Sequence, residues 1–144
     1  MIKILAIDDT VDILTALNLL IEQYMSDKAI SPSDYSIKLQ NNSEEAIETL
    51  DTFKPDLIFL DIMMPEISGF DLLQYIRNNP NIDPQPIVVI STALGDNKTK
   101  AKEQQLKANA YMIKPFDYKT ISIILNRYLP LNQNINIDML DFEI

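Results

Sequence analysis

The sequence has 144 residues, 47% of them apolar, which is enough to build the core of one domain. Its 21 acidic residues against 12 lysines and arginines give a net charge of −9, which argues against direct nucleic-acid binding because that needs clustered basic side chains. The absence of cysteine excludes disulfides, and the absence of histidine removes the usual general base and any His–metal cluster. No signal peptide is evident, and no apolar run approaches the roughly 20 residues that cross a bilayer. We therefore expect a cytoplasmic protein with no membrane partner.

Short apolar runs that stop at polar or charged residues alternate with segments of helical periodicity. Apolar runs without polar alternation are typical of strands that are buried on both faces of a parallel sheet. Ser43 has the features of an N-cap, because two glutamates and a helical pattern follow it. In chain order, the patterns predict a strand at 2–7, a helix at 11–25, a strand at 35–39, a helix opening at Ser43, a strand at 57–60, a helix through 70–76, a strand at 87–90, a helix at 97–107, a strand at 110–113 and a helix at 118–129.

This alternation of strands and helices predicts an α/β fold. Strands joined through helices make right-handed crossovers, which give one parallel sheet of five strands with helices on both faces. We expect residues 1–129 to form a single domain, followed by a short acidic tail at 130–144.

Polar side chains that can bind ligands or take part in reactions follow four of the predicted strands. In an open parallel α/β sheet, binding sites form beyond the carboxyl ends of the strands. Singly, each of these residues has an ordinary explanation as a helix cap, a loop residue or a solvated charge. Together they bring carboxylates, a hydroxyl and an ammonium to one edge of the sheet, which predicts a functional site. The residues are Asp8 and Asp9 after the first strand, Asp61 after the third, Ser91 and Thr92 after the fourth, and Lys114 after the fifth.

Three converging carboxylates need a cation or a proton. Two carboxylates about 4 Å apart repel by roughly 4 kcal/mol at an effective dielectric constant of 20. Oxygen ligands without His or Cys select a hard cation, so we expect Mg²⁺, with Mn²⁺ as an alternative. Mg²⁺, a lysine and a threonine hydroxyl would also neutralise a phosphoryl group carried by Asp61, and phosphoryl transfer depends mainly on such positioning and neutralisation.

Several stretches resemble the receiver domain of the response regulators of two-component signalling systems. The resemblance covers nearly all of residues 1–129. Its most specific part runs from Pro55 to Pro65 and continues in Gly69-Phe70-Asp71, and 4–9, Thr92-Ala93 and Lys114-Pro115-Phe116 also match. The resemblance implies a flavodoxin-like (βα)5 fold. Since no output domain follows residue 129, we expect a single-domain receiver or one excised from a longer protein.

The resemblance implies a role for each acidic residue of the site. Asp61 accepts a phosphoryl group from a histidine kinase or a phosphotransfer protein. Asp8, Asp9 and the backbone carbonyl of Met63 join Asp61 in binding Mg²⁺. The Lys114-Pro115 peptide bond is expected to be cis.

Further roles that the resemblance implies concern the switch. Lys114 pairs with the phosphoryl group, Thr92 moves to contact a phosphoryl oxygen, and Tyr111 is the aromatic residue that swings with Thr92. Two residues are candidates for the switch hydroxyl. By the family's spacing, counting back from Lys114 selects Thr92, whereas counting forward from Pro86 selects Ser91. We favour Thr92, since the residues after it also resemble the family's fourth loop, and Ser91 is the alternative.

The implied function is a phosphorylation-dependent signalling switch and not an enzyme, although it assists its own phosphorylation and dephosphorylation. The expected partners are a histidine kinase or phosphotransfer protein and a downstream protein that binds the altered surface. We expect a monomer or weak homodimer that makes no direct contact with nucleic acid.

Three other functions fit the sequence less well. A degenerate receiver could act as a phosphorylation-independent interaction module, but all residues of the expected site are present. A phosphatase with an aspartyl-phosphate intermediate has a second Asp two residues after its nucleophile, where this chain has Met63. A flavin-binding protein of similar topology needs a loop that accepts phosphate, but Asp8-Asp9-Thr10 is acidic and lacks glycine.

Overall fold

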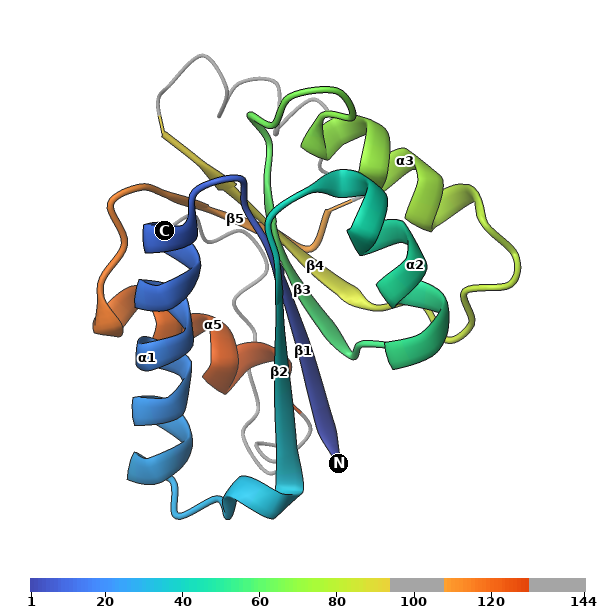
Figure 1. Ribbon diagram of the computed structural model, residues 1–144. Helices are drawn as coiled ribbons and strands as arrows, with labels where there is room; N and C mark the ends of the chain where they lie inside the picture. Colours follow the sequence, from blue (N-terminus) through green and yellow to red (C-terminus); the bar gives the residue numbers. More distant parts are fainter. Residues whose placement is uncertain (94–107, 130–144) are drawn as a thin grey trace.

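The computed structural model describes residues 1–93 and 108–129 and shows one sheet of five parallel strands (Figure 1). The strand order is β2-β1-β3-β4-β5, which makes β3 central. The strands are β1 (Ile2–Ile7), β2 (Tyr35–Gln40), β3 (Leu57–Asp61), β4 (Ile87–Thr92) and β5 (Ala110–Ile113). The described helices are α1 (Val11–Asp27), α2 (Ser43–Phe53), α3 (Gly69–Asn78) and α5 (Tyr118–Tyr128), and η1 (Pro32–Asp34) is a short 3-10 helix. This confirms the predicted flavodoxin-like fold. The predicted helix at 97–107 and the tail at 130–144 lie outside the described residues.

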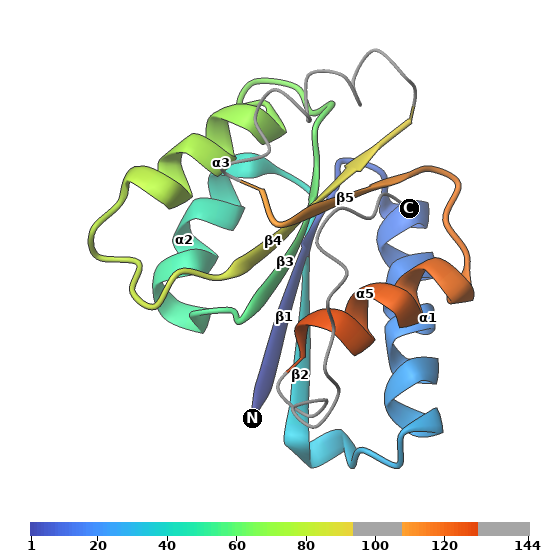
Figure 2. The ribbon, with the colours of Figure 1, turned by 180° about the vertical axis from the view of Figure 1, so that it is seen from behind.

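The helices cover both faces of the sheet, with α1 and α5 on one side and α2 and α3 on the other (Figures 1 and 2). Alternate residues of a strand point to opposite faces, so β1, β3, β4 and β5 each contribute side chains to two separate apolar clusters. We call the two sides the α1–α5 face and the α2–α3 face. The first is lined by Ile4, Ala6, Leu57, Phe59, Val89, Ala110 and Met112, and the second by Leu5, Ile7, Ile58, Leu60, Val88, Ile90 and Tyr111.

The start of α2 differs from the prediction. Asn42 is the N-cap, and its side-chain oxygen accepts a hydrogen bond from the backbone N–H of Glu45 at 2.8 Å. The Ser43 hydroxyl instead donates to the carbonyl oxygen of Ile67 at 2.7 Å. The prediction of Ser43 as the cap was therefore wrong, because a contact with the loop before α3 takes its hydroxyl.

The connection between β1 and β2 is more ordered than its sequence indicates. The helix α1 extends to Asp27, two residues beyond the predicted end, and η1 occupies part of the remaining loop. Two hydrogen bonds join α1 to α5, from the Tyr24 hydroxyl to Asn126 at 2.7 Å and from the Tyr118 hydroxyl to Asp27 at 2.5 Å. Among the helices that the structure describes, none has the length and apolar character needed to cross a membrane.

Candidate functional site

Three carboxylates meet at the carboxyl edge of the sheet, where β1 and β3 lie side by side. Asp8 and Asp9 directly follow β1, and Asp61 is the last residue of β3. One oxygen from each of the three lies within 4.8 Å of the others. Asp8 and Asp61 are each only 3% exposed, whereas Asp9 is exposed to solvent. The first three predicted site residues are thus brought together, with one of them facing solvent.

Lys114, which follows β5, brings an ammonium to this cluster. Its Nζ donates a hydrogen bond to Asp8 Oδ2 at 2.7 Å and lies 3.3 Å from Asp61 Oδ1. The backbone N–H of Lys114 donates to the carbonyl oxygen of Thr92 at 2.7 Å, and the Lys114-Pro115 bond is cis as expected. Burial opposes the charge of Lys114, but the hydrogen bond to Asp8 and the charges of Asp61 and Asp8 outweigh it and raise the pKa of Lys114. The side chain is therefore an ammonium at neutral pH.

Its surroundings strongly perturb the carboxyl of Asp61. Burial, and then the charge of Asp8, raise its pKa to about 6, although Lys114 and the N–H of Met63 act in the opposite direction. Burial and the charge of Asp8 therefore disfavour the anion of Asp61 by more than Lys114 stabilises it. The site therefore favours any ligand that adds a cation next to Asp61.

Backbone N–H groups orient the two buried carboxylates by hydrogen bonds. The N–H of Thr10 donates to Asp8 Oδ1 at 2.9 Å, and the N–H of Met63 donates to Asp61 Oδ1 at 3.2 Å. The chain then turns back at Gly69, whose N–H donates to the carbonyl oxygen of Ile62 at 2.9 Å. A Cβ at Gly69 would lie 2.1 Å from the carbonyl oxygen of Asp61, so only glycine allows this close approach.

Two hydroxyls end β4 and point to opposite faces of the sheet. Ser91 is the register partner of Asp61 and lies two residues after Val89, which lines the α1–α5 face. Thr92 lies two residues after Ile90, which lines the α2–α3 face together with Tyr111. Both are buried, and neither hydroxyl oxygen has a hydrogen-bond partner within residues 1–93 and 108–129. The predicted switch pair, Thr92 and Tyr111, is therefore on one side of the sheet, and Ser91 is on the other.

Two features of the site were not anticipated from the sequence. Spacing alone did not reveal that Lys114 lies closer to Asp8 than to Asp61, because residue order carries no information on side-chain distances. The opposite orientations of Ser91 and Thr92 did have a signal in the sequence. Counting in steps of two along 87–92 assigns the two hydroxyls to different faces.

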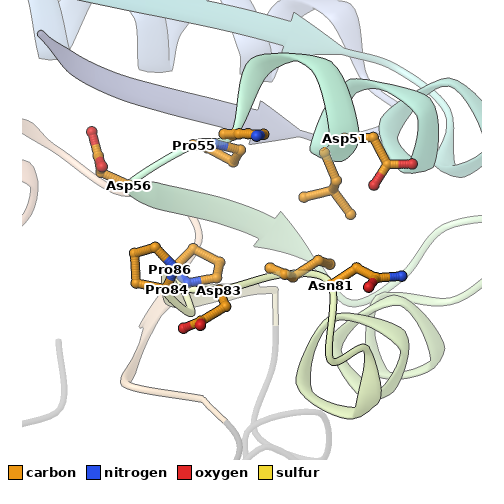
Figure 3. Close-up of a pocket in the computed structure, with 10 residues that line it drawn as sticks. Asp51, Pro55, Asp56, Asn81, Asp83, Pro84 and Pro86 are labelled. Carbon is orange, nitrogen blue, oxygen red and sulfur yellow. The ribbon is translucent and has the colours of Figure 1, made fainter.

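A cavity of about 150 Å³ lies at the opposite, amino-terminal edge of β3 and β4 (Figure 3). It is formed by the end of α2 and the segments that lead into β3 and β4, with Leu50, Pro55, Ile82 and Pro86 among its apolar lining. None of the site residues predicted from the sequence lines it. The acidic edge of the sheet, and not this cavity, is therefore the candidate site.

The fold and the acidic edge define a class of signalling domain. The family model described as the response regulator receiver domain matches residues 4–126, and the chain belongs to this family. Receiver domains act in phosphorylation signalling, and their Mg²⁺ binds in an acidic pocket of the kind that Asp8, Asp9 and Asp61 form here.

Relatives and solved structures agree with this assignment. The chain is 31% identical over 120 residues to the alkaline phosphatase synthesis transcriptional regulatory protein PhoP of Bacillus subtilis, covering 83% of this chain and 45% of that protein. It is 30% identical to the probable transcriptional regulator ycf27 of Cyanophora paradoxa, covering 92% and 50%. The chain thus spans about half the length of these curated relatives. The chemotaxis response regulator CheY4 of Vibrio cholerae has the same fold, with a TM-score of 0.72 at 22% identity over 90% of this chain and 99% of that one.

Proposed function

We propose that this domain is a phosphorylation-dependent switch in which Asp61 accepts a phosphoryl group from a histidine kinase or a phosphotransfer protein. The observation that carries the proposal is a buried carboxylate 3.3 Å from the Lys114 ammonium, inside an acidic cluster, in a member of the receiver family. On this proposal the domain works in the cytoplasm, where phosphoryl donors made from ATP are available. It acts as an acceptor that assists its own phosphorylation and is not a multiple-turnover enzyme.

The residues of the site match what phosphoryl transfer to a carboxylate needs. An oxygen of Asp61 forms a bond to phosphorus while the bond to the donor's leaving oxygen or nitrogen breaks, and the donor leaves with that electron pair. Asp61 must be ionised to attack, and the nearby ammonium of Lys114 favours the anion. Lys114 then compensates part of the charge of about −1.5 to −2 that a phosphoryl group adds.

The donor set fits Mg²⁺. A hard cation prefers oxygen ligands, and the cluster offers three carboxylates in a chain that contains neither His nor Cys. In our proposal Asp8, Asp9, Asp61 and the carbonyl of Met63 hold the ion, with Mn²⁺ as a substitute. The ion would supply positive charge that neutralises the carboxylates and the incoming phosphoryl oxygens.

The proposal assigns the conformational response to Thr92 and Tyr111. They share the α2–α3 face, and Ile90, two residues before Thr92, is the register partner of Tyr111. Recruitment of the Thr92 hydroxyl by a phosphoryl oxygen would empty space on that face, into which Tyr111 could move. A downstream protein would read the altered surface, and the net charge of −9 favours a protein over a nucleic acid as the direct partner of this domain.

The decisive experiment is Mg²⁺-dependent phosphorylation by acetyl phosphate, followed by intact mass. The wild type is expected to gain one phosphoryl group and the Asp61→Asn variant none. Asp51→Asn is the matched control, because Asp51 is an exposed acid of α2 far from the acidic edge, and it should behave as the wild type. Phosphorylation of Asp61→Asn at the wild-type level would refute the acceptor assignment. No response of the wild type would instead favour a phosphorylation-independent interaction module.

A further inference from the structure

Ser91 presents a buried hydroxyl that the proposed switch does not use. Only 4% of its surface is exposed, and its Oγ has no hydrogen-bond partner among the residues that the structure describes. Buried polar groups are nearly always paired, because an unpaired one has lost its water without compensation. The unpaired state of Ser91 indicates a hydroxyl that gains its hydrogen-bond partner only when a ligand occupies the site.

The position of Ser91 indicates which partner that is. Ser91 and Asp61 are register partners on adjacent strands, which lie about 4.8 Å apart in a sheet. Counting in steps of two from the residues that line the α1–α5 face, namely Ala6, Phe59, Val89 and Met112, leads to Asp8, Asp61, Ser91 and Lys114. Ser91 therefore shares a face with Asp8, Asp61 and Lys114, whereas Thr92 does not.

Three of the four oxygens of the Asp8 and Asp61 carboxylates already accept hydrogen bonds. Asp61 Oδ1 accepts the N–H of Met63, and the two oxygens of Asp8 accept from Thr10 and Lys114. A phosphoryl group on Asp61 would bring three strong acceptor oxygens to the same edge. Among the described residues, the Ser91 hydroxyl is an unpaired donor on this face that could bond one of these oxygens.

We propose that Ser91 is a second hydroxyl of the site, which donates a hydrogen bond to an oxygen of the phosphoryl group on Asp61. This inference rests on the proposed function. Ser91 keeps its proton throughout, while Asp61 gains the bond to phosphorus and the leaving group departs with the electrons of the broken bond. The two hydroxyls, of Ser91 and Thr92, then have different roles. Ser91 stabilises the transferred group on the α1–α5 face, and Thr92 passes the change to Tyr111 on the α2–α3 face.

The test measures the rate of phosphorylation by acetyl phosphate in Mg²⁺ for wild type, Ser91→Ala and the control Ser36→Ala, a partly buried serine of β2. Loss of one hydrogen bond to a charged acceptor should slow Ser91→Ala about tenfold. Ser36→Ala should match the wild type. Ser91→Ala should fold normally, since it removes an unpaired hydroxyl and no hydrogen bond, and its thermal unfolding checks this.

A second pair of variants separates the hydroxyl from the shape of the side chain. Ser91→Thr and Ser91→Val have nearly the same volume, but only threonine carries a hydroxyl. Faster phosphorylation of Ser91→Thr than of Ser91→Val, by about tenfold, would support the proposal. Equal rates for these two, or a wild-type rate for Ser91→Ala, would overturn it while leaving the proposed function intact. A wild type that takes up no phosphoryl group would overturn both.

Discussion

Lys114 is held more closely by Asp8 than by Asp61, at 2.7 Å against 3.3 Å. The Asp61 carboxylate therefore shares its cation with Asp8, a neighbour of like charge that also raises the pKa of Asp61. In the resting domain, Asp8 acts on Asp61 both by direct repulsion and by competing for the ammonium.

Replacement of Asp8 should reveal this competition. In Asp8→Asn, without Mg²⁺, the pKa of Asp61 is expected to fall clearly below about 6, because one repelling charge disappears and Lys114 can turn fully to Asp61. NMR titration of the Asp61 carboxyl carbon measures this shift. Asp51→Asn is the control and should leave the titration unchanged, and an unchanged value in Asp8→Asn would contradict the competition.

The buried charge of Asp61 should also lower the stability of the metal-free domain. Its pKa is about 6 in the folded protein against 3.8 in the unfolded chain, so the favourable contribution of its protonated form is complete below pH 3.8 and is lost as the pH rises through 6. This difference of about two pKa units corresponds to roughly 3 kcal/mol at pH 7. Asp61→Asn should therefore be more stable than the wild type in urea at pH 7 with a chelator.

The pH dependence makes the stability prediction specific. The advantage of Asp61→Asn should shrink as the pH falls from about 6 toward 4, because the wild-type carboxyl then takes up its proton in the folded state. A constant difference between pH 7 and pH 4 would show that the variant acts through packing and not through the charge.

Gly69 should be intolerant of even one methyl group. On helix propensity alone, Gly69→Ala in the first turn of α3 would be neutral or stabilising. We expect the opposite sign, a loss of about 1–3 kcal/mol in chemical denaturation, because the added Cβ would lie 2.1 Å from the carbonyl oxygen of Asp61. The displaced backbone should also slow phosphorylation. A stabilised variant would show that the loop after β3 adapts freely.

The two hydroxyl bonds between α1 and α5 should differ in strength. Tyr24 is fully buried, and its hydroxyl donates to Asn126, whereas the bond from Tyr118 to Asp27 is exposed. Tyr24→Phe is expected to cost about 0.5–1.5 kcal/mol of unfolding free energy, since it leaves the Asn126 oxygen without this donor. Tyr118→Phe is the matched comparison and should cost less, because water replaces its bond. Equal losses in urea denaturation would contradict the role of burial.

The elements that could be predicted from the sequence are those whose ends carry a strong local signal. The bounds of β1 and β5 were predicted correctly, because each is a mostly apolar run, broken in β1 only by Lys3, that stops at a charged residue. The cap of α2 was missed, since the contact between Ser43 and Ile67 is tertiary and no local rule reports it. The convergence of Asp8, Asp9, Asp61 and Lys114 followed from the topology, whereas the pairing within that group depends on distances that only the folded chain defines.

The ion pair between Asp8 and Lys114 joins residues 106 positions apart and so ties the first strand to the last. During synthesis, a chain that has already emerged past Asp61 still lacks the ammonium that this site depends on. The cluster of Asp8, Asp61 and Lys114 is therefore complete only once β5 has been added to the edge of the sheet beside β4. A truncated copy that ends before β5 would keep Asp61 but lack Lys114, and on the proposed function it would be a poor phosphoryl acceptor.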